Sequence, residues 1–168
     1  MILTVGLPDA LQRQADAVRN AAAPQAARRA PAHLGLFRHL PGLQRGSLVG
    51  TLRRLSAGPA PQFQLLPPAF WNEIWVAPVR SPALDDIRAE LAECWHGLLA
   101  PGDFAPPRFH ISLNKGRDAP SSLSPGPWRA TGLLLWQHDR PQQAKVERAG
   151  DERDGAFWTP LVGCAFHR

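Results

Sequence analysis

The sequence predicts an α+β fold in a single domain spanning residues 1–168. Strand-like segments outnumber helix-like ones and follow the order β-α-β-α-β-β-α-β-β-β. The sequence contains no glycine-rich dinucleotide motif and no phosphate loop, which would have indicated a parallel α/β sheet with a bound nucleotide. The 168 residues are 44% hydrophobic and 20% charged, which is typical of a folded chain long enough to bury its own core.

Three segments have the periodicity of amphipathic helices. Residues 8 to 21 carry apolar side chains at helical spacing, and residues 43 to 56 repeat leucine at similar intervals but contain two glycines. Residues 82 to 97 give the clearest helical signal, because Ser81 is a good N-cap and Pro82 suits the first helical position. We expect a helix over each segment.

The strand-like segments are rich in β-branched, aliphatic and aromatic residues and are bounded by proline or glycine. They cover residues 1–8, 32–42, 63–66, 70–79, 108–115, 128–139 and 155–166. Residues 22 to 32 are rich in proline and alanine, and they are predicted to be a connector between the first helix and the second strand.

One strand, within PPRFHISLNKG at residues 106–116, alternates apolar and polar side chains. Successive side chains of a strand point to opposite faces, so one face is predicted to be buried and the other to carry a row of hydrogen-bonding groups. The buried face contains Phe109, Ile111 and Leu113, and the polar face contains Arg108, His110, Ser112 and Asn114. A lone His-x-Ser pattern is close to chance, so its meaning depends on a second observation.

A second segment, PAHLGLF at residues 31–37, follows the same pattern, with a proline turn leading into an apolar strand headed by His33. His33 and His110 are 77 residues apart, and each histidine strand follows a helix. We therefore expect two similar lobes, with one histidine from each meeting at a central groove. Strand alternation places the following residues on the side of the first histidine: His33, Gly35, Phe37 and His39.

The sequence resembles the two-histidine (2H) phosphoesterase superfamily, in its 2′-5′ RNA ligase-like (LigT-like) and cyclic phosphodiesterase branch. The resemblance rests on AHLGLFRHLPG and FHISLNK, on the opening ILTVGLP strand with its helix, and on WVAPV with its helix. It covers most of residues 1–115. It implies a bilobal, pseudo-symmetric α+β fold, in which two antiparallel sheets flank a central groove and the helices lie outside.

The resemblance also implies a function, namely the cleavage of 2′,3′-cyclic phosphate or 2′-5′ phosphodiester bonds in RNA or nucleotides without metal or cofactor. By position, His33 and His110 are the catalytic pair, and Ser112 is one phosphate-binding hydroxyl. The second hydroxyl of the family falls on Gly35, which has no side-chain donor. Loss of one such donor costs roughly 10²- to 10³-fold in rate. A non-catalytic nucleotide- or RNA-binding module of the same fold is therefore the alternative.

Two imidazoles suit the opening of a cyclic phosphate, because groups with a pKa near 6.5 can act as base and acid at neutral pH. Arg38 and Arg108 are candidates for offsetting negative charge on the phosphate, and Phe37 is a candidate for stacking on a base. The sequence does not say which histidine is the acid. The six tryptophans are expected to pack in the core and at its rim.

The formal net charge is +5, and it comes from 17 arginines and only 2 lysines. Arginine's planar fork suits phosphate, but a coding bias toward Ala, Pro, Gly and Arg gives the same composition. A third hypothesis is that a basic surface docks a protein or any nucleic acid and that the histidines are incidental.

Cys94 and Cys164 have no metal-ligand spacing and are expected to be reduced. The chain begins without the pattern of a signal peptide, and its opening apolar run is short. We expect a cytoplasmic monomer whose partner is RNA or a small nucleotide phosphate ester.

Overall fold

The computed structural model describes residues 1–116, 118–121, 123–138 and 158–167. The chain forms an antiparallel sheet with α-helices packed on it, which confirms the predicted α+β class. The strands are β1 (Ile2–Gly6), β2 (Leu34–Phe37), β3 (Gln62–Leu65), β4 (Ala69–Trp71), β5 (Ile74–Arg80), β6 (His110–Lys115), β7 (Gly126–Arg129), β8 (Gly132–His138) and β9 (Trp158–Ala165). The α-helices are α1 (Asp9–Ala22), α2 (Pro24–Arg29), α3 (Arg45–Ser56) and α4 (Pro82–Cys94).

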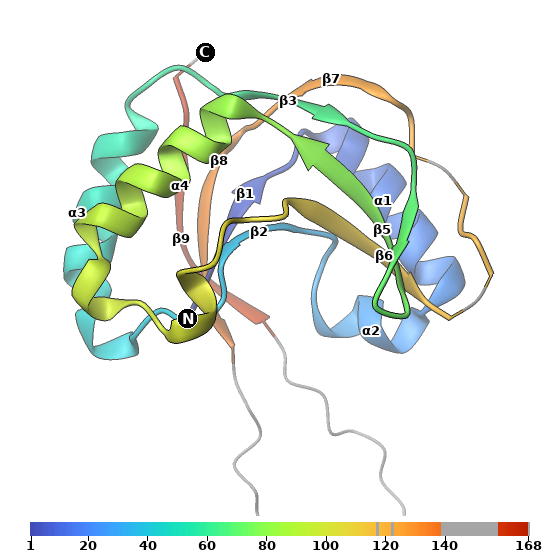
Figure 1. The fold of residues 1–168 in the computed structure, drawn as a ribbon, viewed down its shortest axis with the longest axis horizontal. Coiled ribbons are helices and arrows are strands. Elements are labelled where there is room, and N and C mark those ends of the chain that lie inside the picture. The colour runs from blue at the N-terminus through green and yellow to red at the C-terminus, as the bar shows by residue number, and fades with distance from the viewer. Residues whose placement is uncertain (117, 122, 139–157, 168) are drawn as a thin grey trace, which may run out of the picture.

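The prediction of two separate sheets is wrong, because one sheet runs through the whole chain. Its strands lie in the order β7-β3-β5-β6-β2-β1-β8-β9, and β4 pairs with β5 beside this path. The two halves join where β2 pairs with β6, through Leu34 and Ile111. Figure 1 shows the sheet curving as an arch, with α3 and α4 at one end and α1 and α2 at the other. The predicted central groove stays a prediction.

The three predicted helices are confirmed as α1, α3 and α4. The Ser81 hydroxyl accepts a hydrogen bond from the Leu84 N–H at 3.2 Å, which is the predicted N-cap of α4. The predicted helix over residues 82–97 ends early, because α4 stops at Cys94 and a 3₁₀ turn follows at His96–Leu98.

The connector predicted over residues 22–32 instead contains the short helix α2. The buried Arg19 of α1 donates hydrogen bonds to the carbonyls of Ala26, at 3.4 Å, and Ala30, at 3.1 Å. These contacts satisfy carbonyls at the end of α2 and hold it against α1. The prolines and alanines of residues 22–32 do not by themselves predict the hydrogen bonds from Arg19.

Two predicted strands are each split by a turn. Residues 70–79 form the hairpin of β4 and β5, in which Asn72 and Glu73 take left-handed φ angles of 45° and 67°. Two-residue hairpins use this conformation because its twist matches that of the strands. The segment 128–139 contains the end of β7 and all of β8, and residue 139 lies outside the described residues. In the segment 155–166, residues 155–157 lie outside the described residues.

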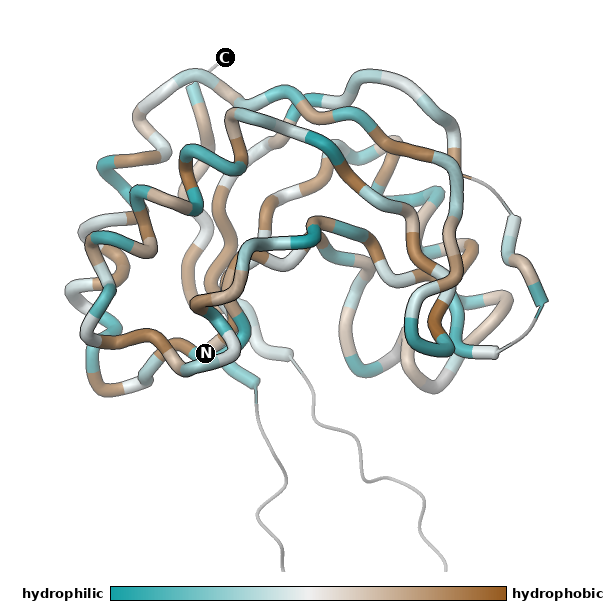
Figure 2. The backbone as a smooth tube through the Cα atoms, in the orientation of Figure 1, coloured by the Kyte–Doolittle hydropathy of each residue, from teal (hydrophilic) through white to brown (hydrophobic). Residues whose placement is uncertain are grey.

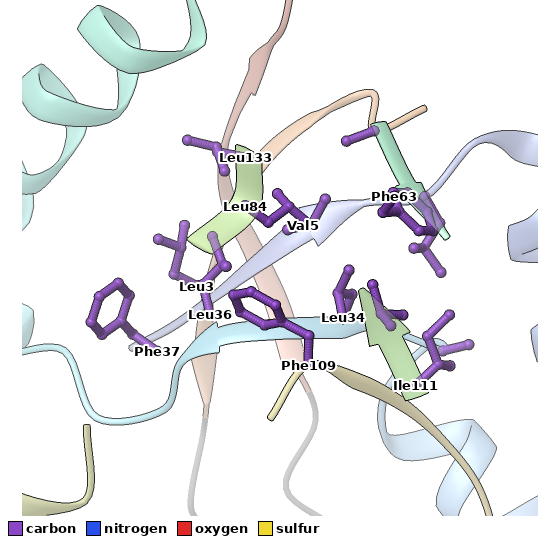
Figure 3. Close-up of a cluster of buried hydrophobic side chains, with 14 of the residues drawn as sticks. Leu3, Val5, Leu34, Leu36, Phe37, Phe63, Leu84, Phe109, Ile111 and Leu133 are labelled. Carbon is purple, nitrogen blue, oxygen red and sulfur yellow. The ribbon is translucent and has the colours of Figure 1, made fainter. Parts of the chain in front are cut away.

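One hydrophobic core serves both ends of the arch. Buried side chains from both halves of the sheet and from α1, α3 and α4 belong to a single cluster. Figure 3 shows Leu3, Leu34 and Ile111, from β1, β2 and β6, inside this cluster. Hydrophobic and hydrophilic residues alternate along many of these elements, as Figure 2 shows. The shared core keeps the two halves of the sheet in a fixed relation.

Among the described residues, no helix has the length and apolar character needed to cross a membrane.

Glu73 is a non-glycine residue held at positive φ, and this costs about 1–2 kcal/mol. We expect Glu73→Gly to raise the free energy of unfolding by about 0.5–1 kcal/mol, because glycine adopts this angle without a clash but loses more entropy on folding. Urea denaturation measures the change. The exposed Ala89 of α4 provides the control, because Ala89→Gly should lower stability by about 1 kcal/mol. A destabilised Glu73→Gly variant would contradict the strained turn.

Candidate active site

The alternation predicted for the second histidine strand is present in β6. Phe109, Ile111 and Leu113 are buried in the core, whereas His110 and Ser112 are partly exposed on the opposite face. The apolar residues fix the strand to the core, so its polar residues must face outward. The sequence therefore positions the second motif by burying its neighbours.

The pairing of β2 with β6 brings the two motifs together. Leu34 is the partner of Ile111 in this antiparallel ladder. Extending the register by one residue in each direction sets Gly35 opposite His110 and His33 opposite Ser112. All four motif positions then share the face opposite the core, and the two histidines are diagonal neighbours. Diagonal positions lie about 7–8 Å apart, which leaves room for an anion between the rings.

Both imidazoles are held by the same local hydrogen bond. His33 Nδ1 lies 2.8 Å from the carbonyl oxygen of Pro31, and His110 Nδ1 lies 2.6 Å from that of Arg108. A carbonyl oxygen only accepts, so Nδ1–H is the donor in each pair. In the neutral ring, Nε2 then keeps its lone pair free to accept a proton. The two motifs are thus alike in structure as well as in sequence.

Burial lowers the pKa of both histidines. For His33 the pKa falls to about 4, because burial of the ring outweighs the hydrogen bond to Pro31, and Arg19, His110 and Arg38 lower it further. The pKa of His110 is lowered by burial and by Arg38 and Arg108, against the opposing hydrogen bond to the Arg108 carbonyl. The charge of His110 is thus one of the causes that lower the pKa of His33. Both rings are therefore mainly neutral at neutral pH in the unliganded protein.

Arg38 is the cation common to both histidines, since its charge lowers the pKa of each. Its side chain is exposed, and it follows directly after β2. The predicted role of Arg38 toward an anion is therefore compatible with its position. An anion near the two rings would also lie within the electrostatic reach of this guanidinium.

Asp103 fixes the backbone of the segment that carries Arg38. Its buried carboxylate accepts the backbone N–H of Arg38 and of His39, each at 3.0 Å. Arg88 donates to the Asp103 carbonyl at 2.5 Å and to the Leu36 carbonyl at 3.1 Å. These hydrogen bonds cross between distant segments and fix the end of β2.

Two tryptophans contact the histidines, although the sequence predicts only packing roles for tryptophan. The Trp158 ring lies 4.3 Å from His33, and the Trp71 ring lies 5.5 Å from His110, measured between centroids. The Arg108 guanidinium stacks 4.2 Å above the Trp71 ring. Arg108 is thereby held beside His110, as its predicted role requires. Trp71 lies in the β4–β5 hairpin and Trp158 in β9, so no local motif links them to the histidines.

Phe37 does not belong to the site. The ladder of β1 and β2 contains a bulge, in which Leu3 pairs with Phe37 but Thr4 pairs with Gly35, so Leu36 is an extra residue. The extra residue shifts the alternation, and the Phe37 ring points into the core with no exposed surface. The structure therefore excludes the predicted stacking of Phe37 on a base.

Gly35 lies beside open space. A Cβ atom at this position would meet no atom within 4 Å. Its cross-strand neighbour Thr4 is buried, accepts a hydrogen bond from Trp136 Nε1 at 2.8 Å and directs its own hydroxyl to the Leu134 carbonyl at 3.5 Å. The Thr4 hydroxyl is thus committed within the protein and does not replace the one missing at Gly35.

A sequence model of the 2′-5′ RNA ligase superfamily matches residues 7–142, a range that includes both histidines. The chain belongs to the 2′-5′ RNA ligase superfamily. The resemblance found in the two histidine motifs is thereby confirmed at the level of the superfamily. A search of curated proteins found no match to the chain.

Several solved structures resemble this superfamily member along nearly their full length. TT0787 of Thermus thermophilus has a TM-score of 0.70 at 19% identity, covering 99% of this chain and 98% of its own. E. coli LigT complexed with 3′-AMP has a TM-score of 0.66 at 18% identity, covering 99% and 97%. E. coli LigT complexed with phosphate has a TM-score of 0.64 at 16% identity, covering 99% and 96%. At these identities the likeness shows a shared fold.

The low histidine pKa values predict how stability depends on pH. Between about pH 6.5 and the folded pKa of about 4, the unfolded state binds a proton at His33 that the folded state does not. We therefore expect the free energy of unfolding to fall by up to about 3 kcal/mol as the pH drops through this window. Urea denaturation at several pH values measures this loss of stability, and His33→Gln should reduce the change in the free energy of unfolding with pH. NMR titration showing His33 at its ordinary pKa would contradict the buried, neutral ring.

Proposed function

We propose that the chain is a phosphoesterase that acts on 2′,3′-cyclic phosphate or 2′-5′ phosphodiester bonds of RNA or nucleotides by acid–base catalysis, without a metal. The observation that carries the proposal is the matched pair of imidazoles, each tied through Nδ1 to a carbonyl two residues earlier. Among the described residues, no three His, Cys, Asp or Glu side chains gather in a group that would hold a metal ion. E. coli LigT, which shares the fold, has been crystallised with phosphate and with 3′-AMP.

In the proposed reaction on a cyclic phosphate, His33 is the base and His110 the acid. His33 Nε2 takes a proton from water, whose oxygen attacks phosphorus, and His110 gives a proton to the ribose oxygen that leaves as the P–O bond breaks. The assignment follows from the surroundings of His33, which keep its ring neutral down to about pH 4. A bound phosphate anion raises the pKa of a nearby histidine, so substrate supplies the charge that His110 needs to carry its proton.

Two other groups support the phosphate. In this proposal the Ser112 hydroxyl, which lies opposite His33 when the register is extended, donates to a non-bridging oxygen. Arg38, near both rings, stabilises the negative charge that develops on the phosphate. The Trp71 and Trp158 rings border the two histidines and offer apolar surface to a nucleoside.

A binding module without catalysis is the second candidate, and Gly35 is the observation that favours it. The site has one hydroxyl at Ser112 and none at Gly35, and the Thr4 hydroxyl beside Gly35 is engaged elsewhere. A phosphate is thereby held less firmly on one side. Binding then persists while the transition state loses part of its stabilisation.

Replacing either histidine distinguishes the two candidates. We expect His33→Ala and His110→Ala to lower the turnover of a 2′,3′-cyclic nucleotide by about 10²- to 10⁴-fold, because each removes a proton-transfer group. Phosphorus NMR follows the cyclic substrate and its product. His96→Ala is the matched control, since this exposed histidine lies in the 3₁₀ turn after α4, away from the motifs. Tight binding by the unmodified protein with no product would support the binding module instead.

Restoring the missing hydroxyl tests the role of Gly35. We expect Gly35→Thr to raise the rate by at least tenfold, because a single lost donor costs about 10²- to 10³-fold and open space surrounds the position. Gly35→Val is the control, since valine has almost the same shape as threonine but no donor. Equal rates for a well-folded Thr variant and the Val variant would show that the hydroxyl is not the missing part.

A further inference from the structure

The face that carries His110 continues across three further strands. His110 pairs with Pro78 of β5, and Arg80 lies two residues further on the same face. Arg80 pairs with Gln64 of β3. Pro78, Arg80 and Gln64 therefore lie on the same face of the sheet as His110.

The next strand, β7, extends this face to a second arginine. Gln64 pairs with Pro127 and Gln62 pairs with Arg129, so Arg129 lies on the same side as Arg80. On the opposite side of these strands Phe63, Leu65 and Val79 are buried in the core, as the alternation requires. We call the four polar residues Gln62, Gln64, Arg80 and Arg129 the Arg80–Arg129 face.

The charge of the Arg80–Arg129 face is uncompensated. All four side chains are exposed, and among the described residues neither guanidinium has an ion-pair or hydrogen-bond partner. None of the residues that share this side of β3, β5 and β7 is acidic. A hollow of about 400 Å³ lies here, and its lining includes Gln62, Gln64, Arg80, Pro82 and Pro127. The surface offers cations and amides without a protein partner.

We propose that the Arg80–Arg129 face binds the sugar–phosphate backbone of a single-stranded RNA whose terminal cyclic phosphate lies between the two histidines. This inference rests on the proposed function, and it adds a surface that holds the nucleotides preceding the terminal phosphate. Guanidinium groups bind phosphate in a forked geometry, and glutamine amides bind phosphate and sugar oxygens. Adjacent strands are about 4.8 Å apart, so β3 and β7 lie roughly 10 and 14 Å from β6, a distance that a few nucleotides cover.

Continuity with the catalytic face favours RNA over an acidic protein as the occupant. An acidic protein bound to the Arg80–Arg129 face would not need the neighbouring histidines. An RNA strand that ends in a cyclic phosphate presents phosphate groups both to this face and to the two histidines. Charge complementarity alone supports any polyanion. Because the strand register places both surfaces on one face of the sheet, the arrangement favours a ligand long enough to contact both.

The experiment compares a 2′,3′-cyclic mononucleotide with an eight-residue single-stranded RNA that ends in a 2′,3′-cyclic phosphate. We expect the unmodified protein to have a lower KM for the oligonucleotide, and the double variant Arg80→Ala/Arg129→Ala to raise that KM at least fivefold. The double variant should leave the mononucleotide kinetics unchanged. Loss of two phosphate contacts should also reduce the slope of log affinity against log salt by about 1.4, measured by fluorescence anisotropy.

The control double variant Arg13→Ala/Arg53→Ala removes the same charge from exposed positions on α1 and α3. It should bind the oligonucleotide like the unmodified protein. Equal KM values for the two substrates, an equal loss in the control, or full displacement of the RNA by an equal concentration of an acidic peptide would each overturn the inference. Absence of turnover of both substrates by the unmodified protein would overturn the proposed function, and anisotropy would still report on the Arg80–Arg129 face.

Discussion

The pairing of Leu34 with Ile111 is the constraint on which the candidate site depends. Both side chains are fully buried in one core, so neither strand can slip by a residue without exposing them. A slip of one residue moves every side chain to the opposite face. The same pairing that joins the two halves of the sheet therefore sets His33 and His110 on one side of it. Burial of apolar neighbours, rather than any contact between the polar groups, creates the site.

Those features that depend on local pattern were predictable from the sequence. Alternation in FHISLNK separates His110 and Ser112 from the buried residues, and Ser81 with Pro82 marks the start of α4. Features that depend on distant partners were not predictable. The bulge that buries Phe37 arises in the ladder with β1, and α2 is held by Arg19. The single sheet is of this second kind, because it depends on the pairing of β2, which follows His33, with β6, which begins at His110.

The two halves of the site are alike in geometry but unequal in environment. Each imidazole donates Nδ1–H to a carbonyl two residues earlier, and each contacts a tryptophan ring. His33 is nevertheless the more strongly shifted, with a pKa near 4. Unequal pKa values divide the roles of base and acid between two like histidines more sharply than equal values would. Unequal burial of like groups supplies the difference.

The surfaces on the two sides of the histidines also differ in chemistry. Trp136 and Trp158 lie on the β1–β8–β9 side, where Trp136 binds Thr4 and Trp158 contacts His33. Arginines lie on the β5–β3–β7 side, at Arg80 and Arg129. Aromatic rings favour bases and guanidinium groups favour phosphates, so a nucleic acid laid across the face meets a different chemistry at each end. In the complex that we propose, this difference would orient the strand, with its backbone toward Arg80 and Arg129 and its terminal phosphate at the histidines.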